Sequence, residues 1–529
     1  MNTFLKPFVM ECSRLQNEGF VFSTEPQPRK VVPLLFCGDA PARAIVRNSK
    51  QFNGEYGCDW CESPGVTLRT GDGPPTRYYP YWTPVTMRSG RKQARYALQG
   101  TPAKPVKGVK GVTVIDLLPT FETVCGVTAD YMHSVCLGVT RKMVDLWVDS
   151  KHHNEEYYIG RKVDIINKRL QAISPPSEMH RAPRPLSERC HWKASEWRPF
   201  LFYSLVVLKG ILPARYLNHF FLYVYGVYIP LGDSITQASI ACAEAALNKF
   251  VIQVEQLYGL QHCSFNVHCL THLPHCVKDC GPLWSTSAFI FESHNHCLLK
   301  MFNGTQCVPE QITDTFMLKR TTNSMARSCI DGNTCISIVN LLKKLNDTAK
   351  FAHDDTCATV SKGKATRINI TASQTIAIQN LLNLDVVNRS GLLYQRFVHD
   401  HQIYSSVHYT RAKRHSNCTI MFKGETESLE YGTVLGLLEV KPHCECNGNS
   451  IQYCNCQQYL VVLVKPMGVN NIDLYKDADF NLSSSFLLDV FDREVVLALF
   501  PNQILCKCIL MCLGNKKFVC PLPFRIYGD

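Results

Sequence analysis

Two pairs of metal-ligating side chains stand far apart in the sequence. Cys58 and Cys61 have the two-residue spacing that lets both thiolates reach one tetrahedral zinc ion. His268 and His272 are four residues apart, so on a helix they share one face. Each pair alone also fits ordinary core or surface side chains. Together they predict one Zn²⁺ site that ties two distant segments, with His275 as an alternative ligand for one histidine.

A second group of cysteines lies near the C-terminus, in a segment with the glycine and asparagine of a hairpin loop. Four thiolates can close a structural zinc site. A loop that is simply rich in cysteine is the alternative, because Cys-x-Cys spacing is less typical of zinc sites than Cys-x-x-Cys. The four residues are Cys444, Cys446, Cys454 and Cys456.

Three acidic residues are candidates for phosphoryl-transfer chemistry. Such chemistry uses two or three carboxylates around Mg²⁺ or Mn²⁺. Asp39 follows a short apolar run, Glu292 follows an aromatic run, and Asp130 stands three residues before His133. Each of these acids, taken singly, also fits a helix cap or a surface position.

The elements around these residues mix strands with a long polar excursion. Residues 31–37 and 112–118 read as buried strands, which places Asp39 at a strand end, where α/β sheets carry functional groups. Residues 62–111 read as a surface excursion. Its part from Arg88 to Gly111 contains seven basic residues and no acid. We expect a flexible basic loop that either follows a phosphate backbone or is simply solvated.

The middle of the chain is helical. The clearest helix follows Ser234, has an apolar stripe from Ile240 to Leu257, and ends at Gly259. Residues 200–231 are apolar, but they are broken by charged residues and Pro213 into pieces too short to span a bilayer. We therefore expect buried helices and no membrane partner.

Length and composition are those of a globular protein with more than one core. The chain has 529 residues, of which 46% are hydrophobic and 19% are charged. Its net charge of +12 favours an anionic partner such as nucleic acid. The 26 cysteines and the absence of a secretory signal pattern indicate a reducing, intracellular compartment.

Several segments resemble the transposase domain of CACTA-type (En/Spm, Tnp2-like) DNA transposons. They occur in the family's order up to about residue 310. The β-like runs beyond residue 400, which suggest a small sandwich or barrel, are similar to the tail of these transposases. The motifs are GDAPAR at 38–43, QFNGEYGCDWC at 51–61, DYMH at 130–133, WKASEW at 192–197 and FESHN at 291–295.

The resemblance implies an RNase H-like α/β fold with an Asp-Asp-Glu site and a helical insertion before the Glu. It makes Asp39 the second catalytic acid and Glu292 the third, both as Mg²⁺ or Mn²⁺ ligands, with Asp130 as a possible auxiliary. It also points to zinc on the Cys and His pairs. The expected organisation is a partial core with the Cys-x-x-Cys knuckle and basic loop at 1–140, a helical insertion at 141–262, a return to the core at 263–345, a linker at 346–395 and a β domain at 396–529.

The family's first catalytic Asp precedes these motifs on the first strand of the sheet, and no acid before Asp39 lies in a strand-like context. We therefore expect an incomplete core in a truncated or domesticated transposase, whose DNA cleavage and strand transfer are impaired. The implied partners are DNA, at transposon ends or in chromatin, and further copies of the chain in a homo-oligomer, in the nucleus. The alternative is a non-catalytic, zinc-stabilised scaffold that binds DNA or protein.

Overall fold

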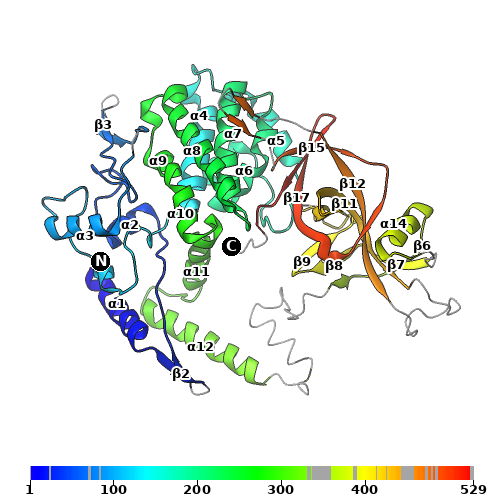
Figure 1. Ribbon diagram of the computed structural model, residues 1–529, viewed down its shortest axis with the longest axis horizontal. Helices are drawn as coiled ribbons and strands as arrows, with labels where there is room; N and C mark the ends of the chain where they lie inside the picture. Colours follow the sequence, from blue (N-terminus) through cyan, green and yellow to red (C-terminus); the bar gives the residue numbers. More distant parts are fainter. Residues whose placement is uncertain are drawn as a thin grey trace.

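The fold has a helical N-terminal half and a C-terminal half built on strands. The computed structural model describes residues 2–22, 25–69, 73–82, 85–329, 335, 337, 359–384, 390–412, 414–424, 426–441, 458–470, 475–477, 480–482 and 486–524. Figure 1 shows a helical bundle in the middle, the N-terminal segments on one side of it and the C-terminal strands on the other.

The N-terminal segments form short helices and two small hairpins. Each hairpin is a separate two-stranded antiparallel sheet. The elements are α1 (Asn2–Asn17), β1 (Phe20–Phe22), β2 (Glu25–Arg29), α2 (Ala40–Val46), β3 (Val66–Leu68), β4 (Thr76–Tyr78), α3 (Gly90–Gln99) and η1 (Val114–Leu117).

The prediction of an RNase H-like α/β core is wrong. Residues 31–37 make one isolated parallel bridge, between Phe36 and Val127, and Leu34 is 71% exposed. Residues 112–118, predicted as a second strand, instead contain η1, where the Thr113 N–H donates to Asp116 Oδ2 (3.1 Å). A parallel strand needs hydrogen-bonded neighbours on the sheet, and the described N-terminal residues supply none beyond that bridge.

The middle of the chain is a bundle around one large aromatic core. The predicted helix over 234–259 is confirmed as α8: its N-cap is Thr236, and Gly259 at its C-cap adopts a φ of 93°. The bundle comprises the π-helical η2 (Met132–Thr140), α4 (Arg141–Val148), α5 (Val163–Gln171), α6 (Ala194–Leu208), α7 (Ala214–Tyr228), α8 (Gln237–Tyr258), α9 (Phe265–Cys269), η8 (Leu270–His272) and α10 (Leu273–Cys280).

The apolar stretch at 200–231 lies inside this core. It contributes most of α6, whose side chains are almost all buried, and α7, whose side chains are mostly buried. Across the described residues, no helix combines the length and the apolar character that a membrane crossing needs. Two further helices, α11 (Phe289–Leu299) and α12 (Val308–Cys329), follow the bundle.

The C-terminal strands form a closed six-stranded barrel. Its ring runs β12–β15–β18–β17–β10–β11 and closes by pairing β11 with β12, with every neighbour antiparallel. The prediction of a C-terminal β domain is thus confirmed in part. The barrel strands are β10 (Thr419–Lys423), β11 (Leu429–Val440), β12 (Tyr459–Asn470), β15 (Leu488–Asp492), β17 (Ile504–Leu513) and β18 (Lys516–Pro521).

Further elements surround the barrel, and some lie in residues 346–395, which the sequence suggested as a linker. β16 pairs with β12, β7 extends the sheet from β11 to β6, and β8 joins β5 to β9. These elements are β5 (Val360–Lys362), β6 (Thr366–Asn369), α14 (Ala372–Leu382), β7 (Ser390–Tyr394), β8 (Arg396–His399), β9 (Gln402–Ser405), β13 (Tyr475–Asp477), β14 (Phe480–Leu482) and β16 (Leu497–Leu499).

The barrel and the helical bundle share a hydrophobic core. The fully buried Phe486 ring stacks on Phe221 of α7 (ring centroids 5.8 Å apart) and on Tyr228 (4.7 Å). The Tyr228 hydroxyl also donates to the Pro521 carbonyl on β18 (2.8 Å). The two parts are therefore packed as one unit.

Candidate metal centre

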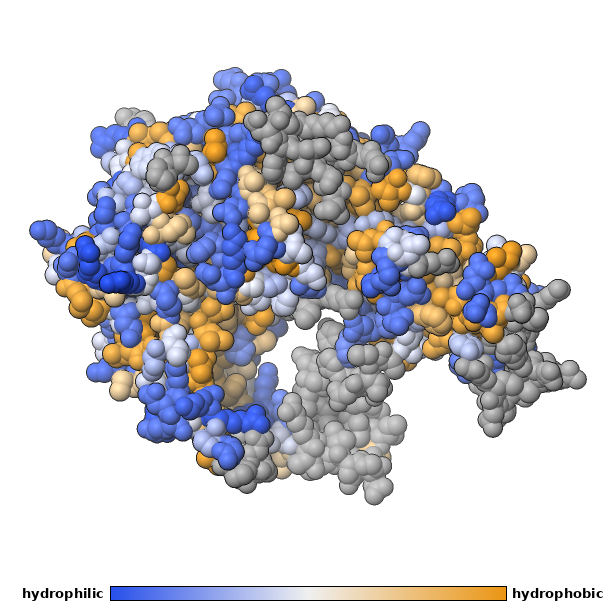
Figure 2. Space-filling view, viewed as in Figure 1, coloured by the Kyte–Doolittle hydropathy of each residue, from blue (hydrophilic) through white to orange (hydrophobic). Residues whose placement is uncertain are grey.

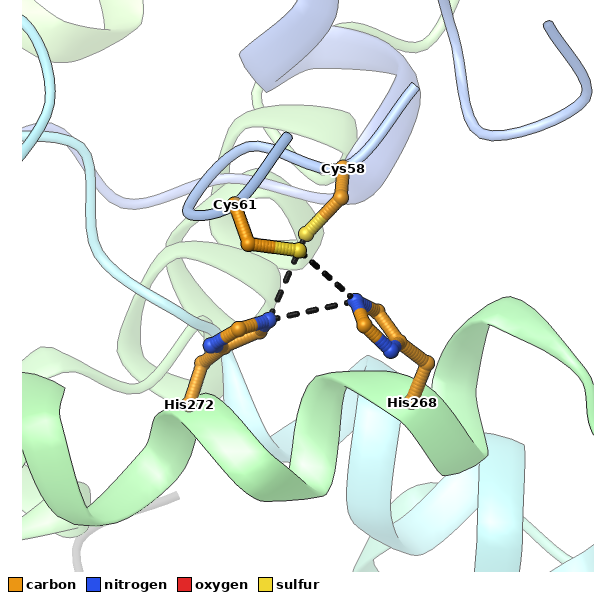
Figure 3. Close-up of side chains that lie close together, drawn as sticks. All are labelled: Cys58, Cys61, His268 and His272. Carbon is orange, nitrogen blue, oxygen red and sulfur yellow. Dashed lines mark hydrogen bonds between the residues drawn. The ribbon is translucent and has the colours of Figure 1, made fainter. Parts of the chain in front are cut away.

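The structure brings the two predicted ligand pairs together. Cys58 Sγ lies 3.5 Å from His272 Nε2, and Cys61 Sγ lies 3.3 Å from His268 Nε2. The two Nε2 atoms are 3.2 Å apart. Figure 3 shows both thiols pointing toward the two rings across a small gap. All four donor atoms lie within 4.8 Å of one another, and all four side chains are buried.

These separations fit a tetrahedral zinc ion. With Zn–N bonds of about 2.0 Å and Zn–S bonds of about 2.3 Å, tetrahedral angles place two nitrogens about 3.3 Å apart and a nitrogen and a sulfur about 3.5 Å apart. The observed 3.2, 3.3 and 3.5 Å are close to these values. The Cys58, Cys61, His268 and His272 group could therefore bind a metal ion such as zinc. A set of four protein ligands leaves no open position, which is typical of a structural site.

The environment favours the metal-binding protonation state at Cys58 and His272, whereas at Cys61 the hydrogen bond to Cys58 and burial raise the pKa of the thiol. Burial alone would raise the pKa of Cys58, but the Cys61 thiol and the two imidazoles hold this pKa well below its usual value. Burial lowers the pKa of His272, which keeps its imidazole neutral. Zinc binds the thiolate and the neutral imidazole, so both shifts suit a metal centre.

A tight turn before Cys58 and two aromatic rings position the ligands. A Cβ atom on Gly57 would stand 2.2 Å from the Gln51 carbonyl oxygen, so the close approach of the backbone at residues 51 and 57 requires glycine. The Tyr79 ring stacks on His268 (centroids 5.3 Å apart), and the Trp60 ring lies 5.7 Å from that of His272. Packing of this kind fixes the orientation of each imidazole.

Arg88 forms hydrogen bonds to the backbone of the Cys-x-x-Cys knuckle. Its Nε donates to the carbonyls of Cys58 (3.0 Å) and Cys61 (3.1 Å), and one terminal nitrogen donates to the carbonyls of Tyr56 and Lys107, both at 2.9 Å. The residue is only 8% exposed. The sequence grouped Arg88 with the basic residues that contact phosphate, whereas in the fold two nitrogens of its guanidinium hold the backbone of the metal site.

A buried carboxylate between the two cysteines anchors the knuckle to α2. Arg43 Nε donates to Asp59 Oδ2 (3.0 Å), and Arg47 contacts Asp59 Oδ1 (3.3 Å). Another nitrogen of Arg43 donates to the Gly38 carbonyl (2.9 Å). Sequence reasoning missed these residues. The available signal was two arginines four apart, on one helical face, followed by an acid inside the Cys-x-x-Cys motif.

The two predicted catalytic acids lie at the starts of different helices, α2 and α11. Asp39 is the N-cap of α2, where its Oδ1 accepts the Ala42 N–H (2.8 Å). Glu292 is exposed in the first turn of α11. Among the described residues, neither acid belongs to a group of three or more metal-binding donors within mutual reach. Both acids nevertheless raise the pKa of His133, after the larger effect of its hydrogen bond to Asp130.

Asp130, the possible auxiliary acid, is fully buried and has a structural role. Its Oδ1 accepts the N–H groups of Met132 (3.2 Å) and Ala288 (2.9 Å). Its Oδ2 lies 2.5 Å from His133 Nδ1 and also accepts the His133 N–H (3.1 Å). Asp130 therefore caps η2 and ties it to the start of α11. This accounts for the Asp-x-x-His spacing without a metal.

The remaining predicted positions divide into three cases. His275, the alternative zinc ligand, is absent from the buried group and lies in a second, exposed one. The basic segment is not a loop throughout, because α3 occupies residues Gly90–Gln99. The second cysteine group, Cys444, Cys446, Cys454 and Cys456, falls outside the described residues.

No protein-family model matches the sequence, and no curated protein is significantly similar to it.

Proposed function

We propose that this chain is a transposase-derived DNA-binding scaffold stabilised by zinc, with no DNA-cleaving activity of its own. The observation that carries the proposal is the exposed basic face of α3, which is held against the zinc knuckle. The transposase origin rests on the sequence motifs. Binding to DNA rests on the charge and on the rigid support of this helix.

The α3 helix separates an anchored face from a basic face. Gln93 and Ala97 are buried against the protein, whereas Arg91, Lys92 and Arg95 are exposed. Figure 2 shows strongly hydrophilic surface in the region where Figure 1 places α3. No acid occurs between residues 88 and 111, but Lys92 Nζ lies 3.5 Å from Glu62 Oε1. Arg91 and Arg95 are therefore the residues of this face that we expect to contact phosphate groups.

The support under α3 is polar and well connected. Arg88, two residues before the helix, donates to the carbonyls of both zinc-knuckle cysteines. At the other end, the Tyr96 hydroxyl donates to Glu62 Oε1 (3.2 Å), just after the knuckle. Lys107 lies over the Tyr56 ring, 4.4 Å from its centroid. A preorganised surface loses less entropy when it binds, so zinc in the knuckle should strengthen DNA binding without touching DNA.

The arrangement of the acids argues against cleavage. Two-metal chemistry needs carboxylates that converge on the cations. Asp39 accepts a backbone hydrogen bond as a helix cap, Asp130 is buried and satisfied by backbone donors, and Glu292 is exposed. A DNA-binding role predicts a nuclear location, and the resemblance implies self-association.

The test is fluorescence anisotropy with a labelled duplex at several salt concentrations. We expect the double variant Arg91→Ala/Arg95→Ala to bind at least about tenfold more weakly, and its log–log salt dependence to be shallower by about 0.9 for each lost phosphate contact. The matched control is Arg161→Ala/Lys162→Ala, which removes the same charge from exposed positions on η4 (Gly160–Lys162). If both variants bound DNA equally weakly, net charge alone would explain the effect and the proposed role of α3 would be contradicted.

The same preparation tests the absence of cleavage. Supercoiled plasmid is incubated with the full chain and Mg²⁺ or Mn²⁺, and nicking is read on a gel. We expect none. Nicking that disappears in Glu292→Gln would overturn the non-catalytic part and leave the DNA-binding part standing. Size-exclusion chromatography of the same sample reports self-association.

A further inference from the structure

A second cluster of ligand-type side chains lies on the surface close to the buried metal centre. Cys125 Sγ and ligand atoms of His275 and Asp279 all lie within 4.8 Å of one another. His275 and Asp279 are one turn apart on α10, with His275 Nε2 3.5 Å from Asp279 Oδ2. Cys125 comes from the segment before η2, so the cluster joins two elements that are far apart in the chain.

We propose that Cys125, His275 and Asp279 form a second, exposed zinc site with one open coordination position. A thiolate, an imidazole and a carboxylate together select a transition ion such as Zn²⁺ over Mg²⁺ or Ca²⁺, which prefer oxygen ligands alone. Three protein ligands leave the fourth tetrahedral position to water or to an incoming ligand. This differs from the buried group, where four protein ligands complete the shell.

The surroundings suit an ion that exchanges with solvent. The side chains of His275 and Asp279 are 49% and 35% exposed, and the three residues line a small surface hollow that Trp60 also lines. Partial burial, together with the carboxylates of Glu122 and Asp279, raises the pKa of Cys125 to about 12. Glu122 holds the backbone at this position, because its Oε2 accepts the N–H groups of Val124 (2.9 Å) and Cys125.

An ion at this position would fasten the segment that leads to Asp39. The residue after Cys125, Gly126, accepts the Phe36 N–H at its carbonyl (2.7 Å), and the Thr128 N–H donates to the Phe36 carbonyl (3.1 Å). These two backbone hydrogen bonds hold the segment at residues 36–39 against the segment that follows Cys125. A zinc ion bound by Cys125 and by α10 would link these two segments to the helix that follows His272, independently of any DNA binding.

Cobalt substitution in the full chain tests the site. Co²⁺ bound to thiolate gives a charge-transfer absorption band, and titration counts the equivalents of ion that bind. Cys125→Ser and His275→Ala should each bind one equivalent fewer than the unsubstituted chain, and Asp279→Asn should weaken that equivalent by at least about tenfold. The matched control is Cys242→Ser, which removes an exposed cysteine on α8 and should leave the count unchanged.

The count separates the two sites. The proposal is overturned if Cys125→Ser binds as many equivalents as Cys242→Ser, or if Asp279→Asn binds the second equivalent with unchanged affinity. Circular dichroism of each variant checks that the fold is retained, and the equivalent assigned to the buried group should persist in all of them. Loss of DNA binding in the α3 variants has no bearing on this count.

Discussion

Arg43 Nε lies 3.0 Å from Asp59 Oδ2, and both side chains are buried, at 2% and 5% exposed. This pair fixes the zinc knuckle to α2, the helix that Asp39 caps. Because Arg47 approaches the other oxygen of the same carboxylate, one acid balances two buried guanidinium groups. The knuckle is thus held by zinc on one side and by an ionic cluster on the other.

Asp59→Asn tests this cluster. The amide keeps the shape of the side chain but removes the charge that both arginines face. We expect a loss of about 3–5 kcal/mol in the free energy of unfolding, since a buried charge without a partner is costly. Urea denaturation at pH 7 measures it. Retention of full stability would mean that solvent reaches the two guanidinium groups.

Cys58→Ser tests the buried metal centre. Serine is a poor zinc ligand, so we expect one zinc fewer per chain and a lower melting temperature, because the ion joins segments 214 residues apart. Elemental analysis and thermal unfolding measure the two effects. Cys269→Ser is the matched control: this buried cysteine follows His268 but is not among the four grouped ligands. A full zinc count in Cys58→Ser would disprove the site.

The zinc ligands could be predicted from sequence because their pattern is local. The spacing of Cys58 and Cys61 lets both thiolates reach one ion, and His268 and His272 share a helical face. The meeting of the two pairs is expected from their chemical complementarity and from the family resemblance, not from local spacing. The residues that support the knuckle could not be predicted, because their contacts are non-local. Arg88 is one of many basic residues in the sequence, and only the fold shows that it donates to the Cys58 and Cys61 carbonyls.

The core could not be predicted in the same way. Residues 31–37 have the composition of a buried strand, but whether a strand is buried depends on neighbours that its own sequence does not specify. Here Phe36 finds one bridge and Leu34 is exposed. The helix α8 was easier, because its apolar stripe and its terminal Gly259 carry the information within one segment.

His219 should make stability depend on pH. It is 1% exposed on α7, its Nε2 donates to the Phe250 carbonyl (2.9 Å), and burial lowers its pKa to about 4 from 6.5. The unfolded chain therefore binds the proton first as the pH falls. Stability from this group is complete above pH 6.5 and is lost between pH 6.5 and about 4, a loss of about 3 kcal/mol.

His219→Gln isolates this contribution. Glutamine can donate a similar hydrogen bond but does not titrate in this range. We expect the free energy of unfolding of the variant to fall less steeply between pH 6.5 and 4.5 than that of the unsubstituted chain. Comparing the two chains removes effects common to both, including loss of zinc in acid. Parallel pH profiles would contradict the assignment.

The last prediction concerns the joint between the barrel and the bundle. The Lys507 side chain on β17 is fully buried, and its ammonium contacts the Glu178 carboxylate in the connector before α6. The only other acceptor near it among the described residues is Asn417 Oδ1, at 3.5 Å. Burial lowers the pKa of Lys507, and the nearby Glu178 carboxylate offsets part of this lowering.

Glu178→Gln should cost about 3–5 kcal/mol of stability, because it leaves the ammonium buried without a charge partner. The double variant Glu178→Gln/Lys507→Met should recover much of that loss, since it also removes the ammonium. The control is Glu427→Gln in the exposed pair with Lys423, which should cost less than about 1 kcal/mol. Denaturation of all four chains measures these differences, and an equal, small cost for Glu178→Gln and Glu427→Gln would show that the joint between barrel and bundle admits water.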